Sequence, residues 1–133
     1  MSGIEQDKVN EIRTKNRSAL KVLLVLYHPM FIGHIVHGRD LEEICSLGRS
    51  TVWRVLKYLW DDGLIEYSSE EKTYSARLTP KGAGYARYFS EQIAPEKYQK
   101  WQNDVAQAHV NGILPQAKEK ELRDELRDYL SFL

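Results

Sequence analysis

The chain has 133 residues, with 19 basic and 19 acidic side chains and a formal net charge of zero. This length suits one domain of ordinary size, and no apolar run approaches the ~20 residues that a membrane-spanning helix needs. The N-terminus lacks the basic and apolar regions of a secretory signal, and the one cysteine, Cys45, excludes an intrachain disulfide. We therefore expect a cytoplasmic protein that has no membrane partner.

The first elements in chain order are two predicted helices. Residues 5–17 are mostly polar with one apolar helical face, and residues 18–27 are strongly apolar at helical spacing. Pro29 ends the second helix because proline restricts the preceding residue and cannot continue the backbone hydrogen bonding. Residues 31–36 are predicted to form a loop with one short strand.

The next segment predicts two further helices joined by a tight turn at Gly48. Asp40 is expected to open the first helix and cap its free backbone amides, with Glu43 as the capping-box partner three residues on. The second helix is predicted over Arg49–Asp62, and Gly63 supplies the positive φ expected after its end. Its inward face consists of Val52, Leu56 and Leu59.

A β-hairpin is predicted after this helix, with strands over residues 64–67 and 73–78 and a polar connection between them. Thr79 and Pro80 then combine a helix cap with a proline at the first helical position. Pro95 starts another helix, and a last helix near the C-terminus carries a stripe of apolar residues. This order predicts a mainly α fold with a small β-hairpin wing.

More specifically, we predict a winged helix-turn-helix with extra N-terminal and C-terminal helices. Two short helices that meet through a turn form a rigid corner, and the second helix then projects a polar face outward. The predicted units are an N-terminal helical extension over residues 1–17, a DNA-binding domain over 18–93 and C-terminal dimerisation helices over 94–133.

Two segments resemble winged-helix regulators of the MarR and PadR type. Residues 41–65 contain the Ser-Thr-Val helix opening at 50–52 and the Gly-Leu-Ile exit into the wing at 63–65, and residues 74–82 contain the Leu-Thr-x-x-Gly junction. The resemblance implies a DNA-binding transcription regulator that works as a dimer. The acidic pair Glu70-Glu71 departs from the basic wing tip of many such proteins, which argues against insertion of this wing into the minor groove.

The outer face of the predicted second helix and the wing supply the candidate contacts to double-stranded DNA. Arginine can pair bidentately with guanine, and serine or threonine can reach a base edge or a phosphate. An ordinary solvated helix face and a hairpin edge kept charged are the alternatives, and Trp53 can also pack partly into the core. The predicted DNA-binding residues are Arg49, Ser50, Thr51, Trp53, Arg54, Lys57, Lys72, Thr73, Arg77 and Lys81.

The extra helices have two predicted roles. Tyr58 and Trp60 occupy outward positions, so the added helices of this chain or of a partner chain are expected to cover them. The apolar stripe of the last helix either packs on its own domain or pairs in a homodimer, and the homodimer is the interpretation we favour. The predicted dimerisation residues are Trp101, Leu122, Leu126, Tyr129 and Leu130.

No phosphate loop, nucleophile elbow or HExxH motif occurs in the sequence, so we expect no enzyme activity and no cofactor. His34, His37, Asp40 and Cys45 form only a weak metal pattern, and no metal site is predicted. The predicted function is a sequence-specific, nucleoid-associated transcriptional regulator, more specifically a repressor because no activation domain is visible. The alternatives are a plasmid or viral accessory protein for partition or replication, and a winged helix that binds another protein.

Overall fold

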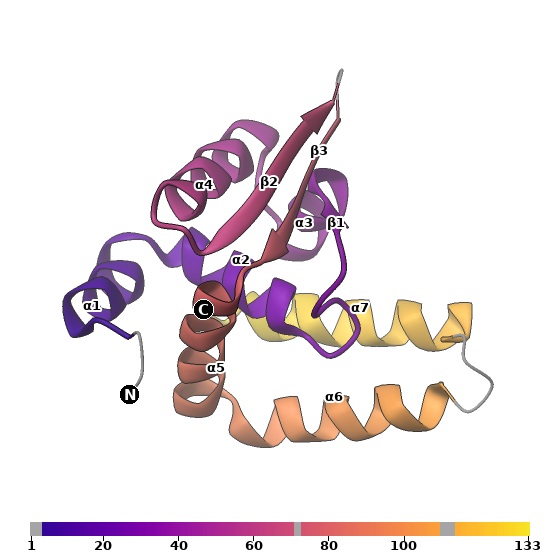
Figure 1. Ribbon diagram of the computed structural model, residues 1–133. Helices are drawn as coiled ribbons and strands as arrows, with labels where there is room; N and C mark the ends of the chain where they lie inside the picture. Colours follow the sequence, from indigo (N-terminus) through magenta and orange to yellow (C-terminus); the bar gives the residue numbers. More distant parts are fainter. Residues whose placement is uncertain (1–3, 71–72, 110–113) are drawn as a thin grey trace.

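The structure is a computed structural model that describes residues 4–70, 73–109 and 114–133. These residues form a mainly helical chain with a small antiparallel sheet (Figure 1). The helices are α1 (Gln6–Lys15), α2 (Arg17–Tyr27), α3 (Gly38–Cys45), α4 (Arg49–Asp61), α5 (Pro80–Ile93), α6 (Pro95–Ala108) and α7 (Gln116–Leu130). The strands are β1 (Val36–His37), β2 (Ile65–Glu70) and β3 (Thr73–Leu78).

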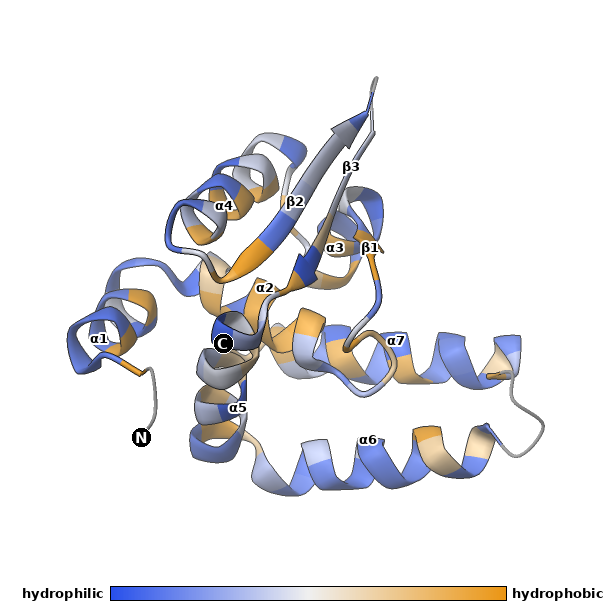
Figure 2. Cartoon of the chain, in the orientation of Figure 1, coloured by the Kyte–Doolittle hydropathy of each residue, from blue (hydrophilic) through white to orange (hydrophobic). Residues whose placement is uncertain are grey.

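Helix α2 lies at the centre of the fold and contacts α1, α3, α4 and α5. Its central run from Val22 to Leu26 is buried on every side, which explains why these five residues are all apolar. The Asn16 side chain accepts a hydrogen bond from the Ala19 amide at 3.2 Å and caps its first turn. The surrounding helices need only one apolar face each, and Figure 2 shows the orange residues of α4 on the side that faces α2.

The sheet has the strand order β1-β3-β2, and both pairs are antiparallel. Val36 of β1 pairs with Ala76 of β3, and Tyr67 of β2 pairs with Ala76 from the other side. The short strand expected within residues 31–36 is therefore confirmed at the edge of the sheet. The hairpin connection expected from residue 68 is wrong at its start, because Ser68 and the two residues after it continue β2 to Glu70.

Helices α6 and α7 run beside each other below the rest of the chain in Figure 1. The Trp101 indole joins them, donating a hydrogen bond from Nε1 to Glu125 Oε2 at 3.1 Å. Tyr98 of α6 donates a hydrogen bond from its hydroxyl to the Leu24 carbonyl of α2. One cluster of buried residues includes side chains from α1, α2, α6 and α7, so the three predicted units share a core.

Local sequence signals account for the end of α4 and the start of α5. Gly63 has a φ of +73°, as expected for the residue that follows the helix. The Thr79 hydroxyl accepts a hydrogen bond from the Gly82 amide at 3.0 Å, which confirms the predicted cap before Pro80. Gly82 is required for another reason, because a Cβ there would lie 1.7 Å from the Leu64 carbonyl oxygen.

The expected capping role of Asp40 is wrong. Helix α3 begins two residues earlier, at Gly38, and His37 occupies the capping position without a side-chain hydrogen bond. The Asp40 carboxylate instead accepts a hydrogen bond from Arg123 of α7 at 3.0 Å. An ion pair across 83 residues of sequence therefore replaces the local contact and holds α7 against α3.

Within the described part of the chain, no helix is long and apolar enough to cross a membrane.

Candidate nucleic-acid interface

The N-terminal half of α4 is the candidate interface. Four residues of this helix, Val52, Val55, Leu56 and Leu59, are buried against the core. The opposite face is exposed and repeats at helical spacing through Ser50, Trp53, Arg54, Lys57 and Trp60. Trp53 and Trp60 are 49% and 53% exposed, an unusual amount of apolar surface for one helix face.

The cationic residues of α4 all lie in its first nine residues, and Asp61 ends it. Arg54 donates a hydrogen bond from Nε to the Ser50 carbonyl at 3.4 Å, which turns its guanidinium toward the beginning of the helix. Free backbone amides in that first turn add partial positive charge. The exposed face is therefore electropositive at its N-terminal end even though the whole chain has no net charge.

The hairpin holds Trp53 in place. Its Nε1 donates a hydrogen bond to the Tyr67 hydroxyl of β2 at 3.1 Å. Tyr67 is itself partly buried and packs against the core. Trp53 is thus half-exposed and hydrogen-bonded to the sheet, so about half of its surface is covered by the rest of the chain.

A cleft of about 550 Å³ opens where the N-termini of α3 and α4 meet β3. Arg39 and His37 line it together with Arg49 and Thr73. The Arg49 guanidinium lies 6.0 Å from the centre of the Tyr74 ring. The sequence did not single out Arg39 or His37 for this region, because only the pairing of β1 with β3 brings the start of α3 beside the hairpin.

The Tyr74 ring forms the floor of this cleft and is buried. Its hydroxyl donates a hydrogen bond to Glu42 Oε2 of α3 at 2.7 Å. Burial, reinforced by the Glu42 carboxylate, raises the pKa of the Tyr74 hydroxyl above its usual range. The Tyr74 side chain therefore stays uncharged, and its hydrogen bond to Glu42 holds it between α3 and the hairpin.

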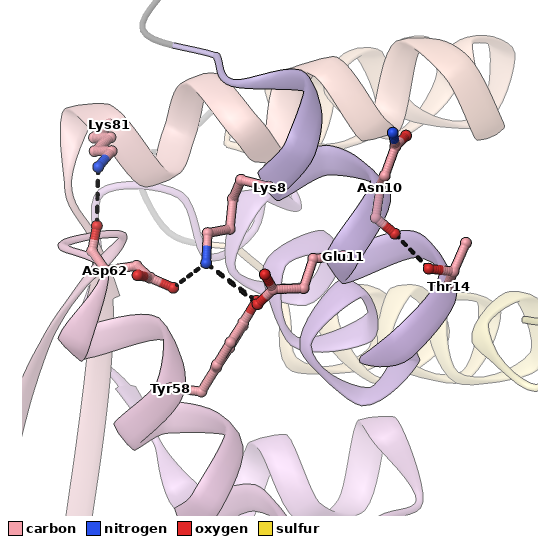
Figure 3. A network of polar contacts seen from close by, with 7 residues as sticks. All are labelled: Lys8, Asn10, Glu11, Thr14, Tyr58, Asp62 and Lys81. Atoms are coloured by element: carbon pink, nitrogen blue, oxygen red, sulfur yellow. Dashed lines mark hydrogen bonds and ion pairs between the residues drawn. The ribbon is translucent and has the colours of Figure 1, made fainter.

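The C-terminal end of α4 is fastened to α1 by a polar network (Figure 3). Lys8 of α1 lies 2.6 Å from the Asp62 carboxylate and 3.4 Å from the Tyr58 hydroxyl, and Tyr58 donates a hydrogen bond to Glu11. Burial and the bond to Glu11 raise the pKa of Tyr58 to about 12. The expectation that an added helix covers Tyr58 is confirmed.

Trp60 differs from that expectation, because it remains 53% exposed beside the helices that the structure describes. The extra helices α6 and α7 lie on the other side of the fold from α4 (Figure 1).

The remaining candidate DNA contacts are spread over the hairpin and the start of α5. Thr73 lies at the tip side of β3 and bonds to the Glu70 carbonyl at 3.0 Å. Arg77 lies at the other end of β3 and forms an ion pair with Glu66 on β2. Lys81 donates a hydrogen bond to the Asp62 carbonyl at 3.1 Å.

The structure thus brings Thr73 and Arg49 together, since both line one cleft. Lys81 lies apart from them, because it bonds to the Asp62 carbonyl at the far end of α4. Thr51 is half-buried on the flank of that helix. Lys72 lies outside the described residues.

The predicted dimerisation residues require a correction. Trp101, Leu122, Leu126 and Leu130 are at most 1% exposed within the single chain. Tyr129 is partly exposed and packs its ring edge against Trp101 at 6.2 Å between ring centres. Packing within the chain therefore accounts for the stripe, and the four buried side chains have no surface left for a second copy.

The weak metal pattern is also dispersed. Burial raises the pKa of the Cys45 thiol to about 12, so the thiolate that a metal would need is disfavoured. Asp40 is paired with Arg123. No group of three or more metal-ligating side chains occurs in the parts of the chain that the structure covers.

No protein-family model and no curated protein matches the chain. Among solved structures, it is similar to the crystal structure of AF1382 from Archaeoglobus fulgidus. The two share 24% sequence identity with a TM-score of 0.54, and the match covers 63% of this chain and 92% of AF1382. At this identity the similarity concerns the fold alone, which is a mainly helical chain with a small antiparallel sheet.

Proposed function

We propose that this chain is a winged helix-turn-helix protein that binds duplex DNA and regulates transcription as a repressor, without enzyme activity. Helices α3 and α4 are the helix-turn-helix pair, α4 is the helix that enters the major groove, and β2 and β3 are the wing. One observation carries the proposal: the exposed face of α4 presents Arg54 and Lys57 beside the hairpin, while its opposite face is wholly buried.

The positions of the basic groups support this proposal. Arg54 lies on the outer face of the helix, and Arg49 at its start lines the cleft beside Thr73 of the hairpin. An N-terminal helix end attracts phosphate through its free amides and its dipole. A docked duplex would then meet Arg54 at base edges and the cleft at the sugar-phosphate backbone.

The test is selection of bound sites from random duplex DNA, followed by titration of the selected site at several salt concentrations. Arg54→Ala is expected to weaken binding to that site by ~1–3 kcal/mol, because a good arginine–guanine pair contributes that much discrimination. Lys97→Ala, which removes an equal charge from the exposed side of α6, is the control and should leave affinity unchanged. Failure to enrich any site, or equal affinity for random DNA, would contradict the proposal.

The proposal includes a homodimer on a palindromic site. A two-fold axis would set two α4 helices about one turn of DNA apart, ~34–36 Å. The interface would lie outside the buried stripe of α7. Analytical ultracentrifugation with and without the selected duplex tests this part, and a single chain on a non-repeated site would overturn the dimer while leaving DNA binding intact.

A protein-binding role is the second candidate, and the exposed indoles of Trp53 and Trp60 favour it. Tryptophan is enriched at the centres of protein interfaces, and the zero net charge is low for a nucleic-acid module. Selection of duplex DNA separates the two candidates. Co-purification of a stoichiometric protein partner, lost in Trp60→Ala, together with absence of any selected site would support this second candidate.

A further inference from the structure

We propose that Trp53 recognises the C5-methyl group of a pyrimidine in the major groove, and that the site bound by this chain contains a thymine at the contacted position. This inference rests on the proposed function, since it requires α4 to lie in the groove. It adds the chemical feature that is read and the residue that reads it.

The hydrogen bonding of Trp53 limits what its indole can recognise. An indole has one donor, Nε1–H, and no acceptor. That donor is already directed to the Tyr67 hydroxyl at 3.1 Å. Trp53 consequently has no hydrogen-bonding capacity left for a base edge or a phosphate, and its 49% exposed surface is available for apolar contact only.

The position of Trp53 on α4 favours contact with a base over contact with the sugar-phosphate backbone of the DNA. Trp53 lies one turn into α4, directly before Arg54 and one turn before Lys57, so cationic side chains flank it on the same face. Those side chains provide the attraction to phosphates, which lets the helix approach the groove despite the apolar ring. The only acidic residue of α4, Asp61, lies two turns further along the helix.

The major groove offers one apolar feature among its base edges, the methyl group on C5 of thymine. An exposed indole held by the Tyr67 hydroxyl gains by covering this methyl, because water is then removed from both apolar surfaces. Tyr67 acts as a positioning residue, since its hydroxyl on β2 sets the orientation of the ring. 5-Methylcytosine carries the same methyl group, so the test must distinguish the two bases.

The experiment uses the full chain and a duplex selected from random DNA. Each thymine of the site is replaced in turn by deoxyuridine, which keeps Watson–Crick pairing but lacks the methyl group. At one thymine in each half-site we expect the affinity of the unmodified protein to fall about fourfold, equivalent to ~0.8 kcal/mol for one buried methyl-sized group. Trp53→Ala should bind the thymine and uracil duplexes equally.

Two control variants sharpen this comparison. Trp60→Ala removes the other exposed tryptophan of the same face and should keep the fourfold preference for thymine. Tyr67→Phe keeps the ring but frees the indole, so the preference should shrink while binding to the uracil duplex stays unchanged. A cytosine–guanine pair at the same position should bind more tightly when its cytosine carries the C5-methyl group, and equal affinity with and without that methyl would overturn the methyl contact.

The outcomes separate the two levels of the proposal. Binding of a selected duplex without sensitivity to any single uracil overturns the methyl contact and leaves the proposed function standing. A uracil effect that persists in Trp53→Ala shows that another side chain reads the methyl and also overturns it. Absence of any selected duplex overturns the proposed function and this inference with it.

Discussion

His28 provides a quantitative test of the packing between α2, α6 and the loop before β1. Its ring is fully buried and lies 4.7 Å from the Trp101 ring, centre to centre. Nδ1 accepts a hydrogen bond from the Met30 amide at 3.0 Å, whereas Nε2 has no hydrogen-bond partner among the described residues. Burial lowers the pKa of His28 to about 3.

Protonation of His28 destabilises the folded chain, because the buried ring binds a proton less readily than the same ring in the unfolded chain. The unfolded chain binds a proton at His28 near pH 6.5, and the folded chain binds it only near pH 3. Stability from this group is therefore present above pH 6.5 and is lost as the pH falls toward about 3. Between pH 7 and pH 4.5 the free energy of unfolding should fall by about 2.5 kcal/mol through His28 alone.

The assay is urea unfolding of the unmodified chain and of His28→Phe at both pH values. Phenylalanine keeps a ring beside Trp101 but cannot titrate, and leaving the Met30 amide without its acceptor should cost about 1–3 kcal/mol at both pH values. The drop in stability on acidification should be smaller in His28→Phe by about 2.5 kcal/mol.

Replacement of an exposed histidine controls for acid effects elsewhere. His34→Gln should lose as much stability on acidification as the unmodified chain, because this side chain lies in solvent. Equal losses in His28→Phe and the unmodified chain would refute the buried, neutral state of His28.

Three further substitutions test close packing. In thermal unfolding, Gly82→Ala should destabilise the fold by about 3 kcal/mol or more, or prevent folding, because the new Cβ would meet the Leu64 carbonyl. Gly84→Ala on the same helix is the control. Its new Cβ would have its nearest contact at 3.9 Å, so this variant should be neutral or stabilising. Leu126→Ala should lower the free energy of unfolding by about 2–5 kcal/mol without changing the molecular mass in solution, since its side chain is buried within one chain. Loss of a dimer with retained stability would contradict that assignment.

Much of the secondary structure could be predicted because its signals are local. The burial of Val52, Leu56 and Leu59 follows from their helical spacing. The Thr79 cap and the positive φ of Gly63 depend on residues within a few positions in the sequence. The cap and the turn involve residues close in sequence, and helical spacing alone predicts which side of α4 is buried.

The candidate site could be predicted only in part. The exposed face of α4, with Arg54 and Lys57, follows from the same periodicity that defines its buried face. The cleft beside Arg39 depends on the pairing of β1 with β3, and no local signal encodes that pairing. The bond that fixes Trp53 likewise requires the hairpin to fold back over α4.

Local patterns in the sequence indicate which segments are helical, where the main turns fall and which side of each helix is apolar, because these properties depend on residues only a few positions apart. The partner of each apolar or charged side depends on contacts between residues that are far apart in the sequence. The Asp40 carboxylate could cap the backbone amides of its own helix or pair with a distant arginine. It forms the ion pair because α7 places Arg123 within hydrogen-bonding distance. The apolar stripe that includes Leu126 could be buried against a second copy or within its own chain. It is buried within its own chain, where α7 packs on α3.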